Sequence, residues 1–261
     1  MVHVTNIQAG HPVDIRGAKG FTLVELMIAL TLGLIVVGAT IAVFISTLQG
    51  SSAVVRSARL NHDMDSLMSL MTNDIRRAGY WGGAGPDMDL SGNPFMTAAE
   101  NIQIIGGNCI VYSYDANRDG HPDIDDDEDT NGTVIDENER YGFRLNNDGS
   151  VSIRLSATTT ASCTDGNWER ITLQEGGEDI QITNLQFTFN GSTCDNFNDS
   201  LGSDSTVDCS GLTTAPASGD NLLVRRVVTI NMAGASANDA GIGKIIQGSV
   251  TLPNDRHILV P

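Results

Sequence analysis

The sequence has few basic residues and few aromatic residues. Its 261 residues include 15 Lys and Arg against 32 Asp and Glu, which gives a formal net charge of −17 at pH 7. A surface of that sign repels a phosphate backbone, so direct nucleic-acid binding by the whole surface is excluded. Aromatic residues make up 5% of the chain while glycine occurs 28 times. This composition favours a β-rich region with many loops over a dense helical bundle.

The sequence also lacks the motifs of the common enzyme classes. It contains no nucleophile elbow, phosphate-binding loop, zinc-binding helix or dinucleotide fingerprint. The five histidines are scattered, and the acidic residues gather in a polar stretch without the apolar surroundings that raise a carboxyl pKa for acid catalysis. We therefore expect that the protein is not an enzyme.

Charged residues are missing from Leu26–Val55, a run of thirty residues. Its apolar part, Leu26–Ile45, is long enough to span a bilayer as one helix. Arg16 and Lys19 precede it and no basic residue follows until Arg56, which predicts an amino terminus in the cytoplasm. The alternative, an ordinary cleaved signal peptide, would have a shorter apolar region followed by a small-residue cleavage site.

One carboxylate interrupts this pattern, because Glu25 stands at the start of the apolar run. A charge inside a bilayer costs about 3 kcal/mol on insertion scales, so it needs a specific partner. The string KGFTLVELMIAL, residues 19–30, closely resembles the class III signal of type IV pilins and type II secretion pseudopilins. The resemblance implies that a prepilin peptidase cuts between Gly20 and Phe21 and methylates the new terminal amine. It also implies that the Phe21 amine of a neighbouring subunit neutralises Glu25 in a filament.

A single long helix is expected after this signal, because no proline lies between Pro12 and Pro86. It would run from about Thr22 to about Ala78. The string NDIRRAGYWGG, residues 73–83, resembles the end of the long helix in PilW-type minor pilins, with J-type pseudopilins as near relatives. The second half of the helix is amphipathic and would pack on a globular head through residues spaced three and four apart, namely Leu60, Met64, Leu67, Met68, Met71, Ile75 and Ala78.

Beyond residue 83 the pattern changes from helix to strand. Apolar residues alternate at 141–145 and again at 151–155, where they are Val151, Ile153 and Leu155. Turn residues lie between these two segments at 146–149, so the pattern predicts a hairpin. Further strands are expected at 180–189, at 228–232 and at 250–252, with the last strand before Pro253. Loops are expected at 156–167 and 191–221.

The expected fold class is α+β, in which the amphipathic half-helix covers one face of a single antiparallel sheet. The domain organisation follows directly from the patterns above. We expect a leader at residues 1–20, the long helix at 21–80 with about 21–48 in the membrane, and a head at 81–261 that carries an acidic insertion at 109–140.

Four cysteines permit two disulfides if the head reaches an oxidising compartment. Among the three connectivities we prefer Cys109–Cys163 with Cys194–Cys209. The second pair would close a loop of about fifteen residues and contribute about 3 kcal/mol in the chain-entropy account. A zinc site is the rival interpretation, but the sequence contains no C-x-x-C pair.

The acidic insertion has the spacing of a calcium loop. Residues 115–139 hold eleven carboxylates and one basic residue, with oxygen ligands at positions 1, 3, 5, 9 and 12 and glycine at position 6. A solvated acidic loop is the alternative, and so is a displaced frame that uses residues 123, 125 and 127. Pro122 at position 8 and an aspartate at position 12 depart from the usual pattern. The expected ligands of a structural Ca²⁺ are Asp115, Asn117, Asp119, His121 through its carbonyl, Asp123 and Asp126.

The resemblance implies a minor pilin in the bacterial inner membrane, with its head in the periplasm and later at the cell surface in a pilus. Such a protein is processed by prepilin peptidase and joins other minor and major pilins in a complex that primes assembly and sits at the tip, where an adhesin is a further possible partner. Motility, adhesion or DNA uptake would follow. The alternatives are a J-type minor pseudopilin of type II secretion and a membrane-tethered calcium-dependent binding module outside any filament.

Overall fold

A computed structural model describes residues 20–82, 93–97, 100–118, 135–172, 180–198, 203–204, 209, 212, 216–236, 239–254 and 256–260. The fold is α+β, as expected, with one long helix and antiparallel sheets. The chain forms two compact units, residues 1–52 and residues 53–261. The second unit contains all the described strands and the second part of the helix.

Helix α1 spans Leu23–Ile75, 53 residues without a proline. Thr22 precedes it, and the Thr22 hydroxyl accepts a hydrogen bond from the Glu25 amide at 3.2 Å, which satisfies one of the free amides of the first turn. The helix ends in a turn that reaches Gly79, whose φ of +73° suits glycine. The Gly79 amide then donates to the Ser113 carbonyl at 2.8 Å, so the end of the helix is tied to the sheet beside it.

The described residues of the head form three sheets. The first has the order β1-β2-β3-β4-β5, the second β11-β10-β6, and the third β12-β9-β7-β8. Every described strand pair is antiparallel. The strands are β1 (Gln103–Ile105), β2 (Cys109–Ser113), β3 (Arg140–Leu145), β4 (Val151–Ser156), β5 (Asn167–Arg170), β6 (Ile180–Thr188), β7 (Thr193–Asn196), β8 (Ser203–Asp204), β9 (Asn221–Arg225), β10 (Val227–Ser236), β11 (Asp239–Thr251) and β12 (Arg256–Leu259). The short helix η2 (Pro94–Met96) lies between α1 and β1, and η3 (Glu137–Glu139) lies between β2 and β3.

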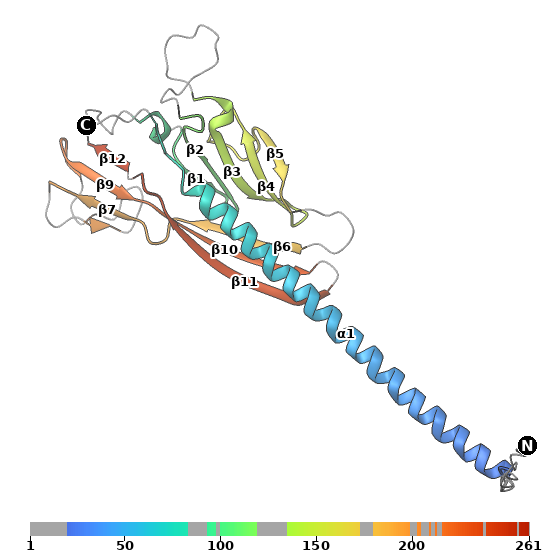
Figure 1. Ribbon diagram of the computed structural model, residues 1–261. Coiled ribbons are helices and arrows are strands. Elements are labelled where there is room, and N and C mark those ends of the chain that lie inside the picture. Colours follow the sequence, from blue (N-terminus) through green and yellow to red (C-terminus); the bar gives the residue numbers. More distant parts are fainter. Residues whose placement is uncertain are drawn as a thin grey trace, which may run out of the picture. The chain divides into compact units, whose positions relative to one another are not determined.

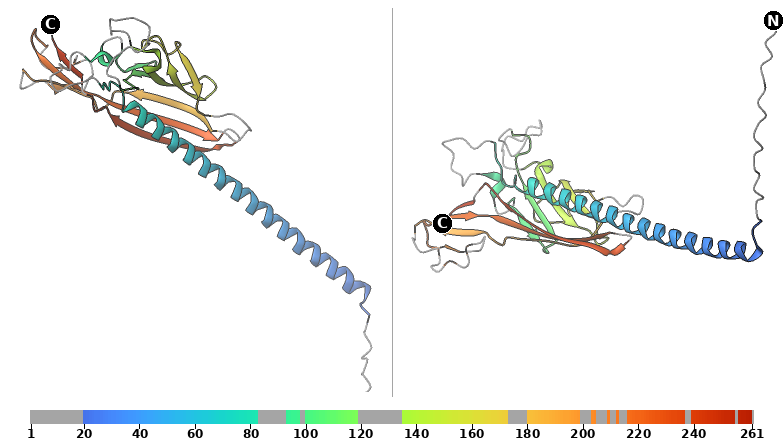
Figure 2. Two further views of the ribbon diagram at one scale, coloured as in Figure 1. Left: turned by 45° about the horizontal axis from the view of Figure 1, so that its top comes forward. Right: turned by 60° about the horizontal axis from the view of Figure 1, so that its bottom comes forward.

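The second part of α1 packs in the head along β10 and β11, with the five-stranded sheet beside it (Figures 1 and 2). Two glycines let the helix approach the strands closely. A Cβ at Gly234 would lie 3.1 Å from the Met64 sulfur, and one at Gly248 would lie 2.6 Å from the Met68 sulfur. The apolar stripe of the helix therefore forms the core, as expected, and its buried members are Leu60, Met64, Leu67, Met71, Ile75 and Ala78.

The expectation of a single sheet was wrong, because the chain leaves one sheet and enters another at Arg226. This residue stands alone between β9 and β10 and is 2% exposed. Its guanidinium donates to the Asn101 side chain and, at 2.6 Å, to the Asn254 carbonyl. These bonds hold the chain at the break between β9 and β10. In the sequence the alternating apolar residues of the two strands look like one continuous strand.

Two expected loop and strand limits were also wrong. The stretch 191–221 contains β7, β8 and the first residue of β9 rather than loop alone, and β12 follows Pro253 as a further strand. Both errors concern the four-stranded sheet. Its small core consists of Cys194, Cys209, Leu212, Leu222 and Val224, so a disulfide supplies much of the apolar surface that sequence alternation normally reveals.

The predicted hairpin is present as β3 and β4, but its faces differ from the expectation. Leu155 is 39% exposed, whereas Arg154 is fully buried. The Arg154 guanidinium donates to the carbonyls of Thr159 and Ser162 at 3.0 and 3.2 Å, and to that of Tyr141 at 2.9 Å. The segment after β4 thus covers the face of the sheet that was expected to be exposed, and burial lowers the pKa of Arg154 to about 10.

The disulfides of the structure are Cys109–Cys163 and Cys194–Cys209, the connectivity that we preferred from the sequence. The first joins β2 to the segment that covers Arg154. The second joins β7 to residue 209 within the small core of the four-stranded sheet. Each disulfide therefore fixes a polar segment that has little apolar surface of its own.

Candidate processing and assembly site

The peptide bond expected to be cut lies just outside the helix. Gly20, Phe21 and Thr22 are not helical and all three are exposed. Space is open around Gly20, where an added Cβ would meet no atom within 4 Å. Because a peptidase needs an extended and accessible substrate, this position suits cleavage between Gly20 and Phe21. The new amino terminus would then be two residues from the helix.

Glu25 lies in the first turn of α1, four residues after Phe21. A negative charge is favourable there, because the free amides of a helix amino terminus carry partial positive charge. The Thr22 cap holds the Glu25 backbone by the 3.2 Å hydrogen bond described above. The side chain is exposed, so it is available to a cation from another molecule.

The segment after Glu25 is apolar and exposed along its length to residue 55. An 18-residue window in α1 has a mean hydropathy of 2.7, which is sufficient for a membrane span by length and composition. The hydroxyls of its threonines form hydrogen bonds within the same helix. Those of Thr31, Thr40 and Thr47 donate to helix carbonyls three or four residues earlier at 2.8 to 2.9 Å.

A second constellation, which we call the tyrosine clasp, joins α1 to β2 and consists of Asp74, Arg77, Tyr112, Tyr114 and Tyr141. The Tyr112 hydroxyl donates to Asp74 Oδ2 at 2.5 Å and the Tyr114 hydroxyl donates to Asp74 Oδ1 at 3.2 Å. The Arg77 guanidinium lies 4.0 Å from the centre of the Tyr114 ring and 3.5 Å from Asp74. Tyr141 stacks on Tyr114 with ring centres 4.4 Å apart. The clasp fixes the last turns of the helix against the sheet.

Sequence reasoning did not find the clasp as a unit. It did single out residues 73–83 as a family signature, and Asp74 and Arg77 lie within that string. The signal that could have completed the clasp is the spacing of Tyr112 in β2 and Tyr114 just after it, near the end of a helix that carries an acidic residue.

The clasp predicts that the protein loses stability as the pH rises above about 10. Burial, and then the Asp74 carboxylate, raise the pKa of Tyr112 well above its usual value of 10.0. In the unfolded chain the tyrosine ionises near that value, so the stability that is present below about pH 10 declines as the pH rises toward the pKa of the folded state. Melting temperatures between about pH 8 and about pH 11 would show this. The decline should be shallower in Tyr112→Phe, and identical slopes would contradict the assignment.

Only two of the expected calcium ligands lie among the described residues. Asp115 is buried and its two carboxylate oxygens accept hydrogen bonds from the Gly82 amide at 2.8 Å and the Arg118 amide at 2.6 Å. Asn117 is exposed. Within the described part of the chain no three His, Cys, Asp or Glu side chains are placed to hold a metal ion. The remaining expected ligands, Asp119, His121, Asp123 and Asp126, lie outside the described residues.

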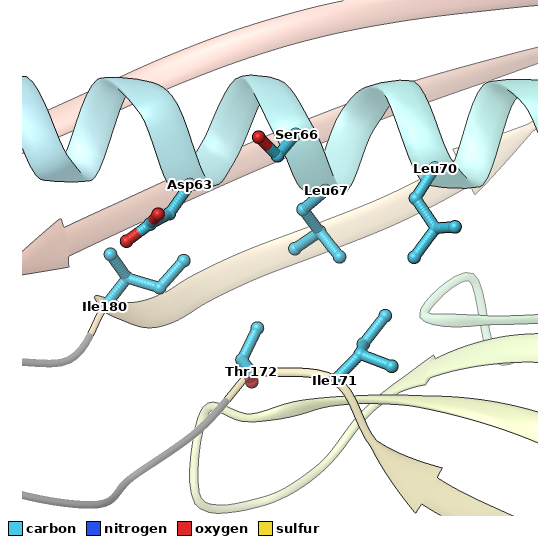
Figure 3. A pocket seen from close by; sticks show the side chains of 7 residues that line it. All are labelled: Asp63, Ser66, Leu67, Leu70, Ile171, Thr172 and Ile180. Atoms are coloured by element: carbon cyan, nitrogen blue, oxygen red, sulfur yellow. The ribbon is translucent and has the colours of Figure 1, made fainter.

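A groove of about 370 Å³ lies beside α1 in the head (Figure 3). The helix lines it with Asp63, Ser66, Leu67 and Leu70, and Ile171, Thr172 and Ile180 face them. Among these described residues only Asp63 is titratable. The groove therefore has no paired acid and base, and its chemistry is that of a contact surface rather than a catalytic centre.

Comparisons with known proteins agree with this description. Residues 53–252 match the family described as prepilin peptidase-dependent protein B, and residues 15–41 match the prokaryotic N-terminal methylation motif. The chain is similar to prepilin peptidase-dependent protein B of Escherichia coli (strain K12), with 28% identity over 157 residues that make up 59% of this chain and 70% of the relative. No solved structure matches. The motif match covers Gly20, Phe21 and Glu25.

Proposed function

We propose, from the premise that the chain belongs to the prepilin peptidase-dependent protein B family, that it is a PilW-type minor pilin of a type IV pilus. The family consists of pilin-like structural proteins, not enzymes. In this proposal α1 first anchors the chain in the inner membrane with the head in the periplasm. The processed protein then joins other minor and major pilins in a complex that primes the pilus and occupies its tip, supporting motility, adhesion or DNA uptake, with an adhesin as a possible partner.

The observation that carries the proposal is the arrangement at the start of α1. An exposed, non-helical Gly20–Phe21 bond lies directly before a capped helix that carries Glu25 in its first turn. A simple membrane tether has no use for a carboxylate at this position, because it makes insertion less favourable. A filament has a use for it, because the Phe21 amine of a neighbouring subunit supplies the missing positive charge.

The proposal is tested by intact-mass and amino-terminal analysis of the protein isolated from its native envelope. We expect a chain that begins at methylated Phe21. A chain that keeps residues 1–20 would contradict the proposal and favour a tethered binding module.

A second measurement is needed to distinguish a type IV pilus from a type II secretion system, since a J-type pseudopilin would be processed in the same way. Deletion of the gene should remove surface pili and leave protein secretion intact. The opposite result would assign the chain to type II secretion.

We further propose that the acidic insertion binds a structural Ca²⁺ through the six ligands expected from the sequence. One structural feature supports this besides the spacing. The carboxylate of Asp115, the first expected ligand, is held in place by the Gly82 and Arg118 backbone amides. We expect millimolar Ca²⁺ to raise the melting temperature relative to EDTA, because an ion that binds only the folded state stabilises it. Mg²⁺ at equal concentration is the control, and Asp123→Asn should reduce the response. No shift with Ca²⁺ would contradict the site.

A further inference from the structure

The outer edge of β11 is a long stretch of strand with one neighbour. In the sheet of order β11-β10-β6, β11 pairs with β10 on one side, and no described residue makes a backbone hydrogen bond to its other side. The strand has 13 residues and contains no proline. Edge strands of this length are normally protected from pairing with other chains by charges, bulges or prolines.

The direction of the free backbone groups follows from the register. The Leu252 amide donates to the Arg226 carbonyl, and the pairing continues without a shift from Thr251 to Gly243. In an antiparallel ladder the backbone groups of alternate residues point to opposite sides. Even-numbered residues therefore bond to β10. The amides and carbonyls of residues 243, 245, 247, 249 and 251 point to the free edge.

The other edge of the same sheet shows what a protected edge looks like here. On β6, the Ile182 amide donates to the Gly149 carbonyl at 2.9 Å and the Phe187 amide donates to the Gly107 carbonyl at 2.7 Å. Turns of the five-stranded sheet thus satisfy that edge. The described residues provide no equivalent cover for β11.

Charge does not protect the β11 edge either. Lys244 is the only basic residue of the strand, and its ammonium group is held by Asp65 of α1 at 2.8 Å on the inner face. From Ile245 to Thr251 the strand carries no charge. Ile245 is 82% exposed on the outer face, where its neighbours along β11 are glycine or polar residues.

We propose that this edge receives an extended strand from a neighbouring pilin-like subunit, which continues the three-stranded sheet. Only an extended backbone matches a row of alternating amides and carbonyls. The net charge of −17 opposes the close approach of a second copy, so the occupant is a different subunit whose strand is neutral or basic. The proposal rests on the proposed function in one respect, namely that the partner is another pilin.

The test uses the full-length chain in its native membrane, with the photo-crosslinker benzoylphenylalanine at Ile245. A matched control places it at Gln186. This residue lies on the same face of the sheet, in the row next to that of Ile245, since Asn231 pairs with both Gln186 and Gln247, but it is on β6. We expect an adduct from position 245 with a second protein that carries a methylated pilin amino terminus, and none from position 186.

The variant Gln247→Pro tests whether the backbone makes the contact. Proline at position 247 removes one outward-pointing amide, while the backbone hydrogen bonds of Ile246 and Gly248 to β10 remain. Edge strands tolerate proline at such positions. We expect the yield of the crosslinked adduct to fall about tenfold, because that factor corresponds to the loss of one to two hydrogen bonds. Ser249→Pro should repeat the effect, and the melting temperature shows whether each variant folds.

Three results would overturn the inference: no adduct from position 245, an adduct of two copies of this chain, or an adduct that persists in both folded proline variants. Failure of the proposed function is distinguishable, because it would appear as a retained leader in the amino-terminal analysis, whatever the edge binds.

Discussion

Glu25→Ala should remove the protein from filaments while leaving it in the membrane. In an assembled filament the Phe21 amine of the neighbouring subunit would lose its counter-charge in apolar surroundings. A single unpaired charge in such a place costs about 3 kcal/mol, which corresponds to about a hundredfold loss of incorporation. Incorporation is measured as the amount of the protein in sheared pili relative to the membrane fraction.

Two further variants make the result specific to the charge. Glu25→Gln keeps the size and polarity of the side chain but not its charge, so it should lose incorporation almost as strongly. Thr31→Ala removes a polar group whose hydrogen bond is internal to the helix, so it should incorporate normally. Normal incorporation of Glu25→Ala would overturn the assembly role of this carboxylate.

Asp74→Ala should destabilise the head by about 2–4 kcal/mol. The substitution leaves the hydroxyls of Tyr112 and Tyr114 without their acceptor, and Tyr112 is fully buried. A buried donor that loses its acceptor costs about 1–3 kcal/mol, and Arg77 loses its nearby carboxylate as well. Thermal or denaturant unfolding of the full-length chain in detergent would measure the change.

The matched control is Asp63→Ala, which removes an exposed carboxylate from the same helix three turns earlier. It should change stability by no more than about 0.5 kcal/mol. Combining Asp74→Ala with Tyr112→Phe should be less than additive, because both changes remove the same hydrogen bond. Equal effects of Asp74→Ala and Asp63→Ala would show that the clasp does not stabilise the head.

The sequence predicts the parts of the molecule whose signals are local. Helix α1 and its buried face could be predicted from three features. These are the charge-free run, the absence of proline and the methionines spaced three and four residues apart. The β3–β4 hairpin follows from alternation around a turn. Leu155 and Arg154 show the limit of that argument, because alternation reveals two faces of a strand but not which one a later segment will cover.

The division into three sheets depends on contacts between residues far apart in the sequence. Arg226 ends one strand through Asn101 and Asn254, which are 125 and 28 residues away. Strand β7 is held by Cys194–Cys209 and pairs with β8, and both strands carry few apolar residues. Their polar composition resembles that of a loop. Neither the contacts of Arg226 nor the polar strands beside the disulfide produce a periodic sequence pattern, so neither could be predicted from the sequence alone.

The threonines of the apolar segment have a consequence for how the protein would leave the lipid. Because Thr31, Thr40 and Thr47 bond to carbonyls of their own helix, none of these hydroxyls needs a new partner when the surroundings change. Moving the segment from bilayer to a protein interior exchanges lipid contacts for side-chain contacts of similar polarity. The free energy of that extraction then depends mainly on packing and on Glu25. In the proposed assembly, Glu25 would therefore make the main polar contribution to that free energy.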